Sequence, residues 1–137
     1  MWSQHRKVAL DSNCFIYLIE GSAYAEPLIE LFQQIEHGEV EAVTSVLTYT
    51  EVLTGAYHMN DTRIIEEYRT TLRHFPHLRF RNMDLPIADL AAQYRTKYRL
   101  KTPDAIQIAT AVIEEADVFV TNDQDYKNVD FPVVFLT

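Results

Sequence analysis

Short apolar runs along the chain alternate with longer stretches in which apolar residues recur at helical spacing. Four apolar runs and one segment of period-two alternation predict strands, over residues 8–10, 40–44, 118–120, 133–136 and 78–81. The longer stretches predict helices over residues 15–19, 24–37, 45–59, 62–75, 86–99 and 103–115. Strands separated in this way by helices predict an α/β fold, with a mostly parallel sheet of four to five strands and helices on both faces.

The helix expected over 103–115 is nearly apolar on every side, which is typical of a helix packed inside a domain. Pro103 suits its first position, and Thr102 suits the cap before it. Asp104 therefore places a carboxylate in the first turn of a buried helix, where it either stabilises the helix or takes part in a reaction. Because the chain has 137 residues, no internal repeat and no linker, we expect one domain over residues 1–137.

Composition narrows the class of protein. The formal net charge of -8 argues against a protein that coats nucleic acid by bulk electrostatics, and leaves open a protein whose acids gather to hold cations. Cys14 is the only cysteine, so an internal disulfide and a cysteine-based zinc site are excluded, and a reducing cytoplasm is the expected location. No signal peptide is expected, and no stretch approaches the ~20 apolar residues needed to span a membrane.

Acidic residues fall where a parallel sheet binds its ligands. Such sheets bind ligands outside the carboxyl ends of their strands, where the strand order reverses. Asp11 closes the first expected strand, and Asp123 follows the 118–120 strand. Asp104 opens the helix that leads into that strand, and Glu51 lies in the helix after the second strand. One topology therefore accounts for the placement of all four acids.

Each acid also has an ordinary structural interpretation. Asp11 suits a helix N-cap, and Asp104 complements a helix dipole. Asp123 lies in an Asn-Asp-Gln-Asp run that suits a surface turn, and a helical glutamate such as Glu51 usually faces solvent. The residues around Glu51, however, are apolar and lack the alternating charges of an exposed helix.

Carboxylates held close together resist joint ionisation, and hard cations relieve their repulsion. Mg²⁺ and Mn²⁺ prefer oxygen ligands, so a site of Asp and Glu without histidine predicts one or two of these ions rather than zinc. Such ions can activate water and stabilise the leaving oxygen in phosphodiester cleavage. Four polar neighbours are candidates to orient the acids or a bound water, with capping and turn roles left open for them: Ser12, Asn13, Thr121 and Asn122.

Four segments resemble the PIN domain, and more closely the VapC-type toxins of toxin–antitoxin pairs. They are Val-Ala-Leu-Asp-Ser-Asn at 8–13, Thr-Glu-Val-Leu at 50–53, Lys-Thr-Pro-Asp-Ala-Ile-Gln-Ile-Ala-Thr-Ala at 101–111 and Val-Thr-Asn-Asp-Gln-Asp-Tyr at 120–126. The resemblance runs from residue 8 to about 135, and Thr-Pro-Asp-Ala is its most specific part. The chain departs from the family pattern at Ser12, Gln107 and Tyr126, where the family more often has Thr, His and Phe. None of these departures removes a metal ligand.

The resemblance implies a metal-dependent endoribonuclease that cleaves single-stranded RNA by metal-activated water and leaves a 5′-phosphate and a 3′-hydroxyl. The family's acidic quartet, catalytic and metal-binding, falls on Asp11, Glu51, Asp104 and Asp123. Family members are commonly homodimers, inhibited by an antitoxin that inserts into or across the active groove. The chain would then be the toxin of such a pair. A non-toxin PIN nuclease that processes RNA and a catalytically silent protein-binding module of the same fold are the alternatives.

A basic run precedes Asp104 and suits RNA binding, because cations grip phosphates and the interleaved tyrosines stack on bases. Its cations are Arg95, Lys97, Arg99 and Lys101, and Arg79 and Arg81 form a second cluster. A solvated face or complementation of a helix dipole is the alternative for the run. A phosphatase is the rival enzyme, but its second acid would stand where the chain has Asn13, and a phosphate-binding glycine loop is absent.

Overall fold

A computed structural model describes residues 2–136. Its sheet has five strands, all paired in parallel, in the order β3-β2-β1-β4-β5. The strands are β1 (Lys7–Leu10), β2 (Glu41–Ser45), β3 (Leu78–Arg81), β4 (Val118–Thr121) and β5 (Val133–Phe135). The helices are α1 (Ser12–Glu20), α2 (Ala25–Glu36), α3 (Val46–His58), α4 (Thr62–His74), α5 (Leu85–Tyr98) and α6 (Thr102–Ile113), with single 3-10 turns η1 (Trp2–Gln4) and η2 (Gln124–Tyr126).

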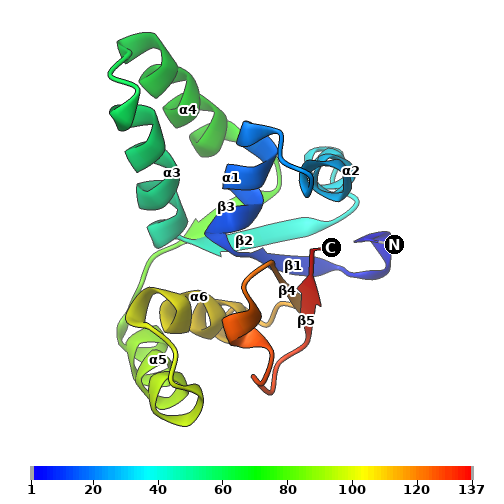
Figure 1. The fold of residues 1–137 in the computed structure, drawn as a ribbon. Helices are drawn as coiled ribbons and strands as arrows, with labels where there is room; N and C mark the ends of the chain where they lie inside the picture. The colour runs from blue at the N-terminus through cyan, green and yellow to red at the C-terminus, as the bar shows by residue number, and fades with distance from the viewer. Residues whose placement is uncertain (1, 137) are drawn as a thin grey trace.

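Helices cover both faces of the sheet, as the sequence predicts. Helices α1 to α4 lie on one face, and α5 and α6 lie on the other (Figure 1). Successive strand residues alternate between two hydrophobic cores, because the side-chain period of a strand is two. Val8 and Leu10 of β1 pack in the core beneath α1 and α2, whereas Ala9 packs in the core shared with α5 and α6. The α/β fold class is confirmed.

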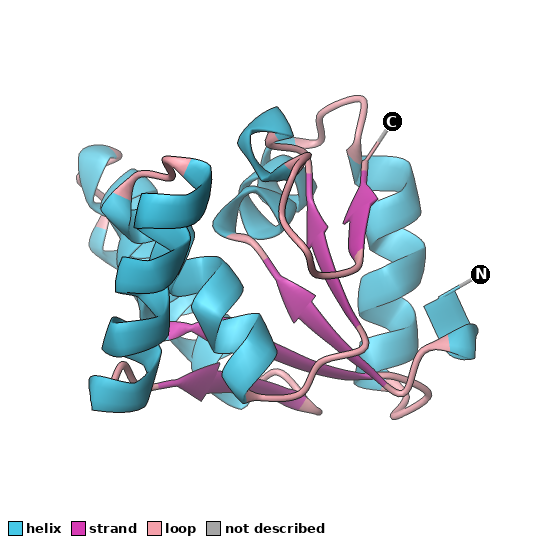
Figure 2. Ribbon diagram, turned by 90° about the horizontal axis from the view of Figure 1, so that it is seen from below, coloured by secondary structure: helices cyan, strands magenta, loops and turns pink. Residues whose placement is uncertain are grey.

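The strand order reverses at β1. The chain moves from β1 outward to β2 and β3, and then returns to place β4 on the other side of β1. Figure 2 shows how the strands fan out across the twisted sheet. The backbone amide of Asp11 donates a hydrogen bond of 3.0 Å to the carbonyl of Val120, so β1 and β4 end side by side. A ligand is expected at the carboxyl ends of these two strands.

The N-termini of α3 and α6 are capped differently, and the second tests a prediction from the sequence. Ser45 caps α3, since its side chain accepts a hydrogen bond from the Leu47 amide. Thr102 does not cap α6, so that prediction is wrong: the N-cap is Lys101, whose extended backbone precedes the helix, and its side chain makes no capping hydrogen bond. The interior of α6 is fully buried from Ala105 to Ala111, as its apolar sequence predicts.

No helix within residues 2–136 combines the length and the hydropathy needed to cross a membrane.

Candidate metal centre

Asp11 lies at the end of β1 and is almost fully buried, with 5% of its surface exposed. One carboxylate oxygen accepts a hydrogen bond of 2.8 Å from the Ser12 amide, which makes Asp11 the N-cap of α1. The other accepts one of 2.7 Å from the Thr121 hydroxyl. Burial raises the pKa of Asp11 to about 7, while these two hydrogen bonds lower it and the charges of Asp104 and Glu51 raise it. The capping role and a place in an acidic site are therefore compatible.

Ser12 connects Asp11 to Glu51. Its hydroxyl donates a hydrogen bond of 2.9 Å to Oε2 of Glu51, a residue that lies 39 positions later on α3. Glu51 is exposed, and this hydrogen bond connects its carboxylate to the start of α1. Glu51 is therefore connected to Asp11 through Ser12 and is also exposed to solvent.

Thr121 connects Asp11 to the segment after β4. Its hydroxyl donates to Asp11 and accepts a hydrogen bond of 3.0 Å from the Asp123 amide. The Asn13 amide donates to the same hydroxyl at 3.3 Å and to Asp11 at 3.5 Å. Asn122, by contrast, turns away, and its amide lies 3.4 Å from the Tyr17 hydroxyl. Three of the four expected supporting residues therefore contact the acids or their hydrogen-bond partners.

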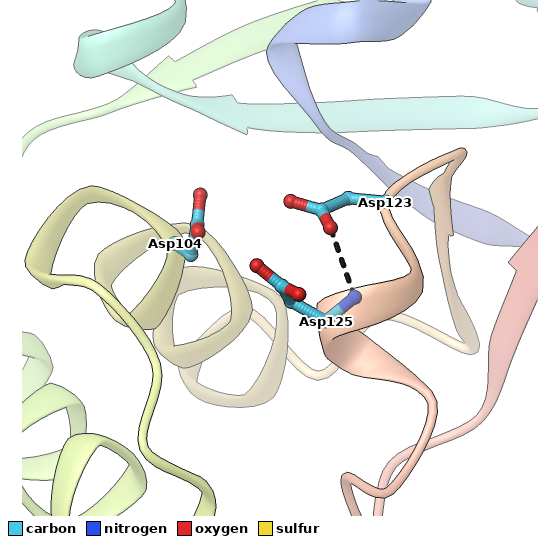
Figure 3. A group of neighbouring side chains, drawn as sticks. All are labelled: Asp104, Asp123 and Asp125. Carbon is cyan, nitrogen blue, oxygen red and sulfur yellow. Dashed lines mark hydrogen bonds between the residues drawn. The ribbon is translucent and has the colours of Figure 1, made fainter.

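Asp104, Asp123 and Asp125 form a compact group, in which one carboxylate oxygen of each lies within 4.8 Å of the other two. Asp104 comes from the first turn of α6, and Asp123 and Asp125 come from the turn after β4 (Figure 3). Asp123 caps this turn by accepting a hydrogen bond of 2.9 Å from the Asp125 amide. The pKa of Asp104 is raised by burial first, and then by the charges of Asp123 and Asp125.

Sequence reasoning missed Asp125. The signal was the spacing of two acids at i and i+2 in Asn122-Asp123-Gln124-Asp125, which resembles an ordinary surface turn. Only the turn η2 brings the second carboxylate back beside the first.

The charges of all four expected acids act on Tyr126. Its hydroxyl donates a hydrogen bond of 3.0 Å to the Asp104 carbonyl, and its ring is buried beneath the site. Burial raises the pKa of Tyr126, and the charges of the four acids raise it further: Asp11, Asp104, Asp123 and Glu51. Hydrogen bonds through Ser12 and Thr121 connect Asp11 to Glu51 and to Asp123. The compact group of carboxylates contains Asp104, Asp123 and Asp125 but neither Asp11 nor Glu51.

The donor set fits a hard divalent cation. The group consists of oxygen ligands only, and none of the ion pairs within residues 2–136 involves Glu51 or the four aspartates. The raised pKa values of Asp11 and Asp104 show the repulsion and desolvation that a cation would relieve. Mg²⁺ and Mn²⁺ meet this chemistry better than metals that favour nitrogen or sulfur.

The basic residues separate into two kinds. Lys97 forms an ion pair of 3.3 Å with Asp130, whereas Arg95 and Arg99 line a groove of about 590 Å³ between α5 and α6. Lys101 is exposed beside Asp104, and its charge partly offsets the effects that raise the pKa of that carboxyl.

The two arginines of the second basic cluster form ion pairs with acids outside the candidate metal centre. Arg79 and Arg81 both form ion pairs with Glu114, at the end of α6, and Arg81 also pairs with Asp84 at 3.0 Å. The structure therefore gives these two arginines a role in joining β3 to α6.

A parallel α/β sheet with an all-carboxylate site at its strand-order reversal defines a class of candidate metal-dependent enzymes. The family model for the PIN domain matches residues 8–132, so the chain belongs to the PIN domain family, whose members are generally nucleases. The resemblance to the PIN domain is confirmed by this match.

Solved structures share the fold over almost the whole chain. A toxin–antitoxin complex from Klebsiella pneumoniae contains a chain that is 25% identical, with a TM-score of 0.76 and coverage of 95% of this chain and 98% of that one. FitAcB from Neisseria gonorrhoeae is 19% identical, with a TM-score of 0.72 and coverage of 92% and 95%. VapBC2 from Rickettsia felis, bound to a promoter DNA fragment, is 16% identical, with a TM-score of 0.69 and coverage of 96% and 99%. No curated protein sequence matches the chain.

Proposed function

We propose that this chain is an endoribonuclease that depends on Mg²⁺ or Mn²⁺ and cleaves single-stranded RNA as the toxin of a toxin–antitoxin pair. The main support is geometric: one carboxylate oxygen of each of Asp104, Asp123 and Asp125 lies within 4.8 Å of the other two. Hydrogen bonds through Ser12 and Thr121 connect Asp11 to Glu51 and to Asp123. The similarity to a chain of a toxin–antitoxin complex supports the biological role.

The residues of the site would have different roles in binding the cation and in holding its ligands. A divalent cation held there would supply an activated water and neutralise charge on the scissile phosphate. Asp104, Asp123 and Asp125 would bind the cation directly, because their oxygens are close enough to share one ion. Asp11 and Glu51, joined through Ser12, complete the donor set. Thr121 and Asn13 hold Asp11 in place from the β4 side.

RNA would approach along the groove between α5 and α6. Arg95 and Arg99 line this groove, and so does Thr102, two residues before Asp104. Guanidinium groups bind phosphates well, and their position would steer a flexible strand toward the acids. Lys101, exposed beside Asp104, would bind the neighbouring phosphate. In a chain with a net charge of -8, this local excess of positive charge is what a polyanion would meet.

The antitoxin would bind in the apolar groove beside Glu51. Residues of α1, α3 and α4 line this groove, including Ile19, Val52, Met59 and Tyr68, and Glu51 also lines it. Ile19 and Met59 are 47% and 55% exposed and lie in the same groove, so they present apolar surface that a partner would cover. An antitoxin segment in this groove would reach the metal site and block it. A homodimer and a cytoplasmic location remain predictions from the resemblance and from the single cysteine.

A cleavage assay tests the proposal. The purified chain should cut labelled single-stranded RNA in Mn²⁺ or Mg²⁺ and not in EDTA. Asp104→Asn should lower the rate at least about 100-fold, the upper end for residues that only support a metal ligand. Asp89→Asn is the matched control, because Asp89 is an exposed acid on α5 outside the site. Equal rates for Asp104→Asn and wild type, or a chain that neither binds Mn²⁺ nor cuts RNA, would overturn the proposal.

A further inference from the structure

Buried hydrogen bonds run between the elements that carry the acids. Nε2 of Gln107 on α6 donates to Oγ1 of Thr48 on α3 at 3.0 Å. The Thr48 hydroxyl lies 2.7 Å from that of Thr44 on β2, and the Thr44 hydroxyl donates at 2.7 Å to the carbonyl of Leu10 on β1. Gln107, Thr48 and Thr44 are 3%, 0% and 1% exposed. Three buried polar side chains thus form a continuous series of hydrogen bonds, called the relay below, from α6 through α3 and β2 to β1.

All hydrogen bonds of the relay are donated in the same sense, from Gln107 toward the Leu10 carbonyl. A threonine hydroxyl has a single proton to donate. The proton of Thr44 goes to the Leu10 carbonyl, so the proton of Thr48 must go to Thr44. Thr48 then accepts from the Gln107 amide. Removing any one of the three side chains therefore interrupts the relay.

Two members of the relay stand one helical turn from an acid of the metal centre. Thr48 precedes Glu51 by three residues on α3, and Gln107 follows Asp104 by three residues on α6. Residues three apart share a helix face and are separated by about 4.5 Å along the axis. The hydrogen bond between Thr48 and Gln107 therefore fixes the separation of α3 and α6 close to the two acids.

The relay ends next to a third acid. Leu10, whose carbonyl accepts the last hydrogen bond, immediately precedes Asp11. The relay therefore joins the segments that carry Asp11, Glu51 and Asp104.

Stability alone gives a poor account of Gln107. Its Oε1 atom is buried and has no hydrogen-bond partner within residues 2–136. A buried acceptor without a partner destabilises a fold, and an apolar side chain of similar length would avoid that cost. The residues on either side of it, Ile106 and Ile108, are buried and apolar. A glutamine at this position is therefore explained by the donor it directs at Thr48.

We propose that Gln107 and Thr48 are positioning residues for the metal centre: their hydrogen bond sets the spacing of α3 and α6, and with it the spacing of Glu51 and Asp104 around the cation. The inference rests on the proposed metal site and is independent of which RNA is cut.

Conservative variants of the full chain test this inference. Gln107→Met and Thr48→Val keep side-chain size and remove the hydrogen bond. Thr110→Val is the matched control, because Thr110 is buried on the same helix but its hydroxyl bonds only to the Ile106 carbonyl of α6 at 2.7 Å. For each protein, calorimetric titration gives the Mn²⁺ dissociation constant, thermal unfolding in EDTA gives the melting temperature, and RNA cleavage gives kcat and KM.

Gln107→Met and Thr48→Val should weaken Mn²⁺ binding by about 10- to 100-fold and lower kcat, with KM for RNA close to wild type. The double variant should bind Mn²⁺ no more weakly than the worse single variant, because both act through one hydrogen bond. Thr110→Val should lower the melting temperature but leave Mn²⁺ binding unchanged.

Two results would overturn the inference, and they differ in whether the proposed function survives. If Gln107→Met and Thr48→Val bind Mn²⁺ as wild type does, whatever their melting temperatures, the relay is only structural and the proposed function stands. If the wild-type chain binds no Mn²⁺, the proposed metal site fails and the positioning role fails with it.

Discussion

Ser12 bridges two acids that are 40 residues apart: its hydroxyl donates to Glu51 at 2.9 Å, and its amide donates to Asp11 at 2.8 Å. A hydroxyl that orients a metal ligand contributes about 10- to 100-fold to metal affinity or activity. Ser12→Ala should therefore weaken Mn²⁺ binding by that factor and leave the fold intact, because alanine suits the first turn of a helix. Ser12→Thr keeps the hydroxyl and should behave as wild type. Unchanged Mn²⁺ affinity in Ser12→Ala would show that Glu51 is oriented by other contacts.

The charge of Asp11 should destabilise the metal-free fold. Burial raises the pKa of Asp11 from 3.8 to about 7, so the folded state holds its proton when the unfolded state has lost it. Stability of the metal-free protein should then fall between about pH 4 and pH 7, by at most about 1.4 kcal/mol per pH unit. Asp11→Asn should melt above wild type at pH 8 in EDTA.

Saturating Mn²⁺ should reverse that order, because only the wild-type site gains the binding energy of the ion. Thermal unfolding at pH 5 and pH 8, with EDTA and with Mn²⁺, measures both effects. Asp89→Asn, which lies outside the site, should show neither. An Asp11→Asn variant that melts below wild type in EDTA at pH 8 would contradict the conclusion that burial disfavours the charge of Asp11.

Asp125 should contribute to cation binding although it is exposed. Its carboxylate lies with those of Asp104 and Asp123, so Asp125→Asn should weaken Mn²⁺ binding. The loss should be smaller than for Asp104→Asn, because Asp104 is half-buried and water replaces an exposed ligand more easily. Titration of the three proteins with Mn²⁺ gives the ranking. Equal affinities for Asp125→Asn and wild type would restrict the site to the four acids expected from the sequence.

The contrast between Asp123 and Asp125 shows what the sequence can and cannot supply. Asp123 could be predicted because it follows a β-branched strand, and strand ends in a parallel sheet meet at one edge. Asp125 could not, because its position depends on the 3-10 turn that begins at Gln124. Asn122 was expected to support the acids, yet side chains alternate in extended backbone. Thr121 and Asp123 therefore lie on one side, and Asn122 lies on the other.

The fold could be predicted more completely than the site, because it depends on patterns rather than on single contacts. In β1, Val8 and Leu10 alternate with Ala9 between two cores, which requires helices on both faces. Helix ends are less certain, as Thr102 shows: its hydroxyl suits a cap, but the backbone enters the helix one residue earlier. Caps are decided by backbone angles that the packing of α6 sets, and the sequence alone does not contain them.

Glu114 should stabilise the fold in a pH-dependent way. It is 12% exposed and pairs with Lys7 of β1 and with Arg79 and Arg81 of β3. The Arg79 hydrogen bond is the largest of several that lower the pKa of Glu114 from 4.5 to about 2. Because the folded pKa is depressed, this stabilisation is present above about pH 4.5 and is lost as the pH falls toward 2.

Glu114→Gln should lower the free energy of unfolding by about 2 kcal/mol at pH 7 and show a flatter decline between pH 5 and pH 3. Denaturant unfolding across that pH range measures both effects. Glu115→Gln is the control, because Glu115 is the exposed neighbour. If the free energies of unfolding of Glu114→Gln and wild type changed with pH in parallel, the ion pairs of Glu114 with its three cations would not be the source of the pH dependence.

Arg99 and Lys97 carry the same charge two residues apart, but the structure predicts different contributions to RNA binding. Arg99 lines the groove between α5 and α6 with Arg95, whereas Lys97 is paired with Asp130. Each phosphate contact on single-stranded nucleic acid adds about 0.7 to the slope of log affinity against log salt. Arg99→Ala should therefore reduce that slope by about 0.7 and weaken binding, and Lys97→Ala should change both much less. Fluorescence anisotropy of labelled RNA with Asp104→Asn protein, which should not cut it, measures the slopes. Equal losses for Arg99→Ala and Lys97→Ala would place the RNA path over the outer face of α5 instead of the groove.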